Sequence, residues 1–277
     1  MNRYLWVLFS CVVAGFSVLW VAGGQLSEAA LSNIGVPPSN VPFEVISNES
    51  VHGWYLPAPG NGSCILLMHG VRSSRREMLG RSIFFRNEGF PSLAIDLQAH
   101  GEAPGEQITF GYKEAESARK AVTFLRTDKG CKSVVALGSS LGGAAALLGE
   151  PLNVEGYILE AVYPGIEKAV KNRLKMRLGG MGDYIAPFLY NQIPIRLGIK
   201  LTELQPAEAI RHIKAPVLIL NGTEDLRTTK EDALRLFKNA PEPKALVWIK
   251  GAGHTNLFEF NHSIYTKAVR EFLATVE

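Results

Sequence analysis

The stretch SVVALGSSLGGAAALL, residues Ser133–Leu148, decides the fold. It begins with an apolar run over Ser133–Leu137, which is typical of a strand buried on both faces of a sheet. It ends with small apolar residues over Leu141–Leu148, which indicate a short buried helix. The junction has the spacing Gly-x-Ser-x-Gly, centred on Ser140. A serine on so sharp a turn needs glycines beside it, because larger side chains would clash with the folded backbone. A glycine-rich turn that merely starts a helix is the alternative interpretation.

Eight segments of the chain have strand character. They are Phe43–Ser47, Val51–Leu56, Cys64–Met68, Ser92–Ile95, Ser133–Leu137, Gly156–Glu160, Val217–Leu220 and Leu246–Ile249. Helical patterns lie between them, at Arg75–Asn87, Tyr112–Leu125, Leu141–Leu148, Lys230–Lys238 and Asn261–Thr275. Such repeated alternation predicts an α/β protein with a doubly wound, mostly parallel sheet and helices on both faces. The first two strands are joined tightly and are expected to form an antiparallel hairpin at the sheet edge.

Residues 164–206 interrupt the alternation, and we expect them to form a helical lid inserted into a domain that spans residues 42–277. Ile166, Val170 and Leu174 recur every four residues and mark one face of a helix. Lysines and arginines occupy its other faces. Two interpretations remain open: a basic lid near anionic lipid or substrate, and an ordinary helix packed on the sheet with solvated lysines.

The first 24 residues differ in character from the rest. No charge occurs from Tyr4 to Ala22, a length that would span roughly 28 Å as a helix. Arg3 precedes this run, and no lysine or arginine follows until Arg72, which predicts an inside N-terminus and an extracytoplasmic domain. Residues 1–24 are therefore predicted to be a membrane anchor, or alternatively a cleaved signal peptide that releases a secreted or periplasmic protein. Residues 25–41 have the composition of a linker.

Composition excludes several classes of protein. Of the 277 residues, 47% are hydrophobic and 20% are charged, which excludes a disordered chain, a collagen-like repeat and a multi-span membrane protein. The net charge is +3, and the basic residues form no long run, so no nucleic-acid partner is expected. Phosphate-loop, dinucleotide-binding and zinc-binding motifs do not occur. We therefore expect neither a metal nor an organic cofactor.

The Ser140 turn, in its strand–turn–helix context, resembles that of the α/β-hydrolases of the serine esterase, lipase and peptidase type. The resemblance covers roughly residues 42–276. It implies the α/β-hydrolase fold, with a mostly parallel eight-stranded sheet and a short helical lid. It also implies a catalytic triad in the chain order Ser, Asp, His, and an oxyanion hole formed partly by the loop after the third strand.

Two further residues complete the implied triad. Asp225 follows the buried strand Val217–Leu220 and matches the family pattern Gly-x-x-Asp, with Glu224 as its rival. His254 lies on a loop with two glycines, between a strand and the last helix. The other histidines are less well placed, since they fall in an edge strand, before a strand, on the last helix or in strand-end loops. The sequence thus predicts Ser140 as nucleophile, His254 as base and Asp225 as the acid that orients it.

The resemblance also suggests roles near the strand ends. The backbone N–H groups of Val71 and Leu141 would form the oxyanion hole. His69 is expected to be structural, and so is Asp96, which would brace the backbone. His100 and Glu102 could line the mouth of the pocket or lie in a solvated loop.

These features predict a serine hydrolase that cleaves a carboxylic ester or a related acyl bond through an acyl-enzyme. The expected substrate is a small or lipid-like acyl compound. A serine peptidase with the same triad is the alternative enzyme, and a catalytically silent binding protein on this fold is the alternative outside enzymes.

Cys64 and Cys131 raise the question of a disulfide, which an exported domain would allow. Cys64 opens the third strand, and Cys131 lies just before the fifth. These strands are neighbours in the resembled fold, about 4.8 Å apart. Counting back from the strand ends places Cys131 about two residues further out, which favours two unpaired cysteines over a bond.

Overall fold

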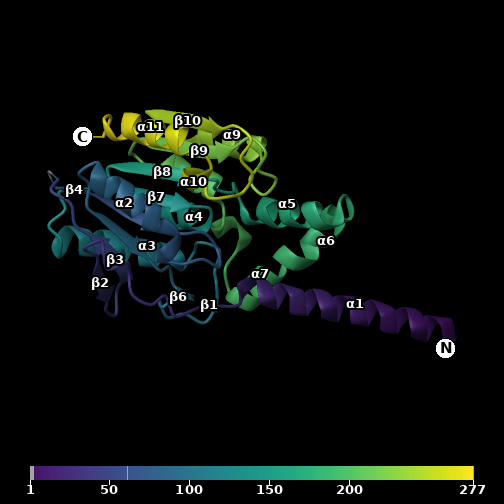
Figure 1. Ribbon diagram of the computed structural model, residues 1–277. Helices are drawn as coiled ribbons and strands as arrows, with labels where there is room; N and C mark the ends of the chain where they lie inside the picture. The colour runs from purple at the N-terminus through teal and green to yellow at the C-terminus, as the bar shows by residue number, and fades with distance from the viewer. Residues whose placement is uncertain (1–2, 61, 277) are drawn as a thin grey trace.

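A sheet of eight strands runs through the centre of the molecule (Figure 1). The computed structural model describes residues 3–60 and 62–276. The strand order is β10-β9-β8-β7-β4-β5-β3-β2. The strands are β2 (Glu44–Ser47), β3 (His52–Leu56), β4 (Ser63–Met68), β5 (Ser92–Ile95), β7 (Ser133–Ser139), β8 (Gly156–Glu160), β9 (Val217–Gly222) and β10 (Lys244–Ile249). All eight expected strands are therefore present.

The sheet is parallel from β10 to β5 and antiparallel beyond it. β3 runs antiparallel to β5, and β2 runs antiparallel to β3 at the edge. The predicted edge hairpin is therefore confirmed, and with it the mostly parallel α/β-hydrolase fold. Because the parallel strands all point the same way, their carboxyl ends and the loops that follow them share one edge.

Helices cover both faces of the sheet. α3 (Glu114–Thr127), α4 (Leu141–Leu147) and α9 (Lys230–Asn239) pack on one face, and α2 (Leu79–Asn87) and α11 (His262–Leu273) pack on the other. Side chains alternate along β4, so Leu66 joins the first apolar cluster and Leu67 the second. Burial on both faces explains why the central strands are continuous apolar runs.

The expected insertion at residues 164–206 is helical. It contains α5 (Ile166–Leu178), α6 (Met181–Tyr190), α7 (Gln192–Leu197) and a 3₁₀ turn η2 (Leu201–Glu203), and α8 (Pro206–Ala209) begins at its last residue. α5 and α6 form a hairpin that projects from the sheet domain (Figure 1). Further short elements are η1 (Arg75–Met78), η3 (Ile210–His212) and α10 (Leu257–Phe260).

The segment before the sheet is bound to the domain, which differs from the linker expected at residues 25–41. Helix α1 (Arg3–Ser27) is followed by a short strand β1 (Ala30–Leu31), which pairs in parallel with β6 (His100–Gly101). Further on, the Ile34 N–H donates to Glu102 Oε1 at 3.0 Å. Because this attachment uses backbone groups over only a few residues, it leaves no periodic pattern in the sequence.

In the described residues, no helix combines the length and the apolarity needed to cross a bilayer. Several side chains on which the predicted anchor depends lie outside the described part of the chain: Tyr4, Leu5, Val7, Leu8, Phe9, Cys11, Val12 and Phe16.

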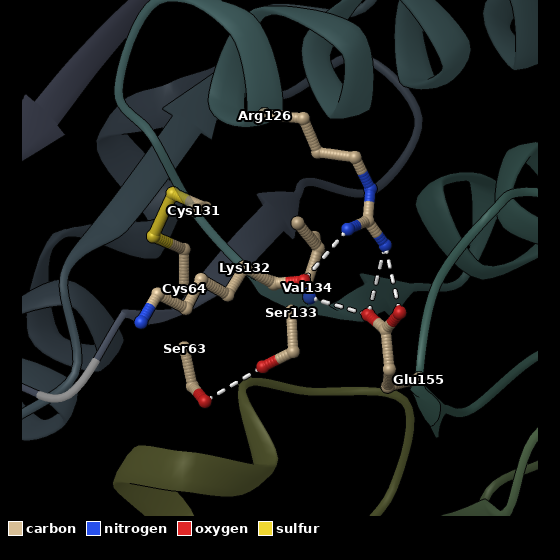
Figure 2. Close-up of a disulfide and its surroundings, with 8 residues drawn as sticks. All are labelled: Ser63, Cys64, Arg126, Cys131, Lys132, Ser133, Val134 and Glu155. Atoms are coloured by element: carbon tan, nitrogen blue, oxygen red, sulfur yellow. Dashed lines mark hydrogen bonds and ion pairs between the residues drawn. A yellow bond between two sulfur atoms is a disulfide. The ribbon is translucent and has the colours of Figure 1, made fainter.

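Cys64 and Cys131 form a disulfide, with their Cα atoms 5.8 Å apart (Figure 2). The expectation of two unpaired cysteines is wrong because the bond does not lie within the plane of the sheet. The Cys64 side chain points to the face that carries α3. After α3, the chain folds back over that face, where the Cys131 N–H donates to the Leu125 carbonyl at 3.0 Å. The bond therefore joins the sheet to the connection above it.

Removing this disulfide is expected to lower the free energy of unfolding by about 4 kcal/mol, since it closes a loop with a sequence separation of 67 residues. The paired change Cys64→Ser and Cys131→Ser tests this by denaturant unfolding, and reduction of the unaltered chain should reproduce the loss. Cys11→Ser is the matched control and should leave the midpoint unchanged. Equal stability of the oxidised and reduced chains would contradict the prediction.

Candidate active site

Ser140 lies on the turn that joins β7 to α4, and its backbone is strained. Its φ of 48° and ψ of −104° fall in a region that side-chain-bearing residues rarely adopt. The flanking glycines permit the turn. A Cβ at Gly138 would lie 2.4 Å from the Gly142 carbonyl carbon, and one at Gly142 would lie 2.4 Å from the Met68 carbonyl oxygen. The glycine spacing in the sequence is therefore a steric requirement of this turn.

A buried polar cluster supports the turn from below. The Ser140 N–H donates to the Glu160 backbone carbonyl at 2.8 Å. The Glu160 carboxylate is paired with Arg81, whose Nη2 lies 2.6 Å from Oε2, and it also accepts a hydrogen bond from the Tyr265 hydroxyl. Arg81 and Glu160 are fully buried. Burial alone would lower the pKa of Arg81, but the Glu160 charge outweighs it and raises that pKa, so Arg81 stays charged.

The sequence pattern does not single out this cluster. The one hint of the cluster in the sequence is Glu160, an acidic residue that ends the otherwise apolar strand β8. A carboxylate buried at that position requires a cation beside it.

Asp225 holds the imidazole of His254. Asp225 lies in the loop after β9, and its Oδ2 is 2.8 Å from His254 Nδ1. The same oxygen accepts a hydrogen bond from Thr228 Oγ1 at 2.6 Å, while Oδ1 accepts from the N–H groups of Arg227 and Thr228 at 2.7 and 2.9 Å. The rival acid Glu224 is exposed to solvent. Asp225 is thus the acid that the fold directs at the histidine.

The charge of Asp225 is well supported. Burial by itself raises the pKa of this carboxyl, but the hydrogen bond and charge of His254 and the hydrogen bonds from Thr228 outweigh it, so its pKa lies below the ordinary value. An ionised Asp225 fixes the proton on His254 Nδ1, and Nε2 is then left as the basic nitrogen.

Ser140, Asp225 and His254 follow β7, β9 and β10, so they come together at the carboxyl edge of the sheet. Ser140 is buried, and the His254 side chain is 17% exposed. Within the described residues, no hydrogen bond joins Ser140 Oγ to His254 Nε2. The hydrogen bond expected between these two atoms is therefore not formed in this structure.

The loop after β4 lies against Ser140. A Cβ at Gly70 would be 3.9 Å from Ser140 Cβ. The next N–H group, that of Val71, and the Leu141 N–H at the start of α4 donate no hydrogen bond to any other described residue. Two free N–H groups, one on the loop that lies against Ser140 and one on the residue that follows Ser140, are what an oxyanion hole requires.

Glu77, on η1, steadies this loop. Its Oε2 accepts a hydrogen bond from the Gly70 N–H at 3.2 Å. The side chain is partly exposed and lies one residue from the Val71 donor along the loop backbone. The sequence gives no signal for this contact, because η1 carries charged residues whether or not they bind a loop.

Asp96, beyond β5, is structural, as the resemblance implied. Its carboxylate accepts from the Arg75 backbone N–H at 2.7 Å and pairs with the Arg75 guanidinium at 2.6 Å. His100 and Glu102 do not line a pocket mouth as one interpretation suggested. His100 is fully buried, and Glu102 binds Arg75 and the Ile34 N–H. Their loop is instead where the N-terminal segment attaches.

His69 is a neutral, buried brace at the end of β4. Its Nδ1–H donates to the Gly70 carbonyl at 2.7 Å, and its Nε2 accepts from the Leu97 N–H at 3.2 Å. Burial lowers the pKa of His69 to about 4, from an ordinary 6.5. The structural role expected for His69 matches this arrangement.

The buried state of His69 should make folding sensitive to mild acid. Above pH 6.5, the imidazole is neutral in the folded and unfolded chains alike. Between pH 6.5 and 4, only the unfolded chain takes up the proton, so the free energy of unfolding falls, by about 2 kcal/mol at pH 5 from this group. Denaturant unfolding at pH 7 and pH 5 measures the loss. In His69→Gln, whose amide oxygen can still accept from Leu97, the loss should shrink by that amount; an unchanged loss would rule out His69 as its source.

Residues 65–264 match the sequence profile of the "Alpha/beta hydrolase family". The chain belongs to this family. Among its relatives, the hydrolase is 23% identical to the YqkD protein of Bacillus subtilis over 228 residues, which covers 80% of this chain and 75% of YqkD.

Solved structures of the same fold include an esterase from Pyrococcus furiosus, with a TM-score of 0.70, 18% identity and coverage of 90% of this hydrolase and 99% of the esterase. They also include the Paleococcus ferrophilus monoacylglycerol lipase, with a TM-score of 0.58 and 20% identity. The match covers 82% of this hydrolase and 99% of the lipase. At these identities, the likeness shows the fold.

Proposed function

We propose that this hydrolase cleaves carboxylic esters or related acyl bonds with Ser140 as its nucleophile. The observation that carries the proposal is the arrangement at the carboxyl edge of the sheet. A serine on a strained turn lies next to two residues with free N–H groups, and an aspartate-bound histidine lies on the loop after β10. Nucleophile, base, orienting acid and oxyanion donors are the parts that acyl transfer needs.

In the proposed reaction, Ser140 Oγ attacks the acyl carbon while its proton passes to His254 Nε2. The N–H groups of Val71 and Leu141 bind the oxyanion that forms. Collapse of this intermediate breaks the bond to the alcohol, which leaves with the proton from His254. Water then attacks the acyl-enzyme, with His254 as base, and releases the carboxylic acid and free Ser140.

The proposed substrate class is a small or lipid-like acyl ester. It is supported by the names of two neighbours in fold, an esterase and a monoacylglycerol lipase.

Labelling with a fluorophosphonate, followed by peptide mapping, tests the nucleophile directly. We expect the label on Ser140 alone, and an unlabelled chain would favour the silent binding protein. A panel of acyl esters of graded length and of peptide amides then separates the two enzymes. Turnover confined to peptide amides would replace the esterase proposal with a peptidase.

We further propose that the catalytic domain lies on the extracytoplasmic side, either anchored or released. Disulfides such as Cys64–Cys131 persist in oxidising compartments. The absence of lysine and arginine between Arg3 and Arg72 supports the same side. A reporter fused to the C-terminus should be active only outside the cytoplasm, and activity inside would refute the orientation.

A further inference from the structure

The hairpin of α5 and α6 carries large apolar side chains that the described part of the chain leaves exposed. Met176 and Leu178, at the end of α5, are 49% and 44% exposed. Met181 and Tyr184, at the start of α6, are 66% and 81% exposed. Single exposed apolar residues are ordinary, but these four gather around one turn at Gly179–Gly180. We call residues 175–184 the hairpin tip.

Basic side chains accompany this apolar tip. Residues 166–190 contain five lysines and arginines against two acidic residues, a net charge of +3. Lys175 and Arg177 are exposed, and neither forms an ion pair with any residue that the structure describes. Asp183 is the one acidic residue of the tip. Apolar side chains flanked by unpaired cations are typical of elements that contact anionic lipid.

Helix α1 projects from the same side of the sheet domain as the hairpin (Figure 1). It is fixed to the lid, because Gln192 Nε2 donates to the Leu19 carbonyl at 3.0 Å and the Arg196 guanidinium lies 3.9 Å from the centroid of the Trp20 ring. Val18 and Val21, on either side of this contact along α1, are exposed. Two elements that project from the same side of the sheet domain thus carry exposed apolar side chains.

The other end of the hairpin is joined to the active site. Asn172, on α5, donates to the Arg227 carbonyl at 3.0 Å and to Asp232 at 2.7 Å. Arg227 is also a backbone donor to Asp225. The hairpin therefore reaches from the loop that holds the triad's acid to the exposed tip.

We propose that the hairpin tip docks on a bilayer that contains anionic phospholipid. Met176, Leu178, Met181 and Tyr184 lie among the acyl chains, and Lys175 and Arg177 lie at the level of the phosphates. This contact goes beyond the hydrolytic reaction, and for a lipid-like ester it places the active site next to the bilayer that holds the substrate. An anionic bilayer accounts both for the apolar side chains and for the cations around them.

A single fluorophore on the tip tests the contact in the full-length chain. Cys11→Ser leaves only the two cysteines of the disulfide, so Tyr184→Cys can be labelled with a probe that responds to polarity. The protein is reconstituted into vesicles of phosphatidylcholine with phosphatidylglycerol. We expect blue-shifted emission and quenching by spin-labelled lipid. The same label at Met181→Cys guards against a local effect of one substitution.

Leu234→Cys is the matched control, since Leu234 is an exposed apolar residue on α9, in the sheet domain. Its probe should behave as in water. If the probes at residues 181 and 184 are as hydrated as the one at 234, the proposal is wrong. Tip probes that become buried only when another protein is added would assign the surface to a protein partner instead.

Charge provides a second test. Lys175→Gln with Arg177→Gln should reduce the preference of the tip for anionic over neutral vesicles, by roughly fivefold for each cation removed. Lys214→Gln with Lys267→Gln, two exposed lysines away from the tip, should leave it unchanged. An equal effect of both pairs would show a general charge attraction and overturn the specific contact.

An activity measurement separates this inference from the proposed function. Met181→Ser with Tyr184→Ser should lower the hydrolysis of an acyl ester held in vesicles and spare that of a soluble short-chain ester. Equal loss on both esters would contradict a role of the tip in lipid contact. Turnover of neither ester by the unaltered chain would refute the esterase proposal, and the probe experiment would still decide the lipid contact.

Discussion

Ser140→Ala is expected to abolish ester turnover, with a loss in kcat on the order of 10⁶-fold. Without Oγ, no acyl-enzyme can form, and the oxyanion donors alone can speed only the direct attack of water. The loss should appear in kcat, because the substrate contacts of Val71 and Leu141 come from the backbone and remain. Steady-state kinetics on the best ester of the panel measure it, and labelling by a fluorophosphonate should vanish together with turnover.

The fold should survive this change. Alanine keeps the Cβ, and its N–H can still donate to the Glu160 carbonyl. The hydroxyl itself forms no hydrogen bond with any described residue, so its removal leaves no partner unsatisfied. Ser139→Ala, one residue earlier on β7, is the matched control and should retain turnover. Retained turnover in Ser140→Ala would remove Ser140 as nucleophile.

The sheet could be predicted from sequence because burial constrains it strongly. The segments Gly156–Glu160 and Ser92–Ile95 are strands with the bounds that their apolar runs indicate. The turn at Ser140 was equally predictable, since only glycine fits where the backbone of one strand end meets the start of a helix. The apolar pattern of a buried strand and the need for glycine in a tight turn both depend on neighbouring residues. They are therefore visible in a short stretch of sequence.

Features that depend on distant contacts were not predictable in the same way. The Cys64–Cys131 bond follows from the path of the chain after α3, which the strand register alone does not reveal. β1 pairs with β6 through the backbone, which any residues can do. Arg81 and Glu160 are 79 residues apart, and nothing on helix α2 shows that Arg81 points inward. The residues of the candidate site were named from the sequence, whereas the contacts that support them required the structure.

Asp225→Asn is expected to lower kcat by about 10⁴-fold with little change in KM. The reason lies in the four hydrogen bonds that Asp225 accepts. Its Oδ1 takes the N–H groups of Arg227 and Thr228, so the single oxygen of asparagine will occupy that position. The amide nitrogen then faces His254 and can only donate to Nδ1. This moves the imidazole proton to Nε2, where the proton of Ser140 would have to be received.

The tautomer of His254 is therefore the measurement that tests the role of Asp225 beyond the rate. Nitrogen NMR of the labelled chain should show the proton on Nδ1 in the unaltered hydrolase and on Nε2 in Asp225→Asn. Glu224→Gln, at the exposed neighbour, should change neither the tautomer nor kcat. If Asp225→Asn retains both, another group must orient His254. If Asp225→Asn loses activity while the tautomer is unchanged, Asp225 acts through its charge on the imidazolium that forms during attack, because the geometry of the base would then be intact.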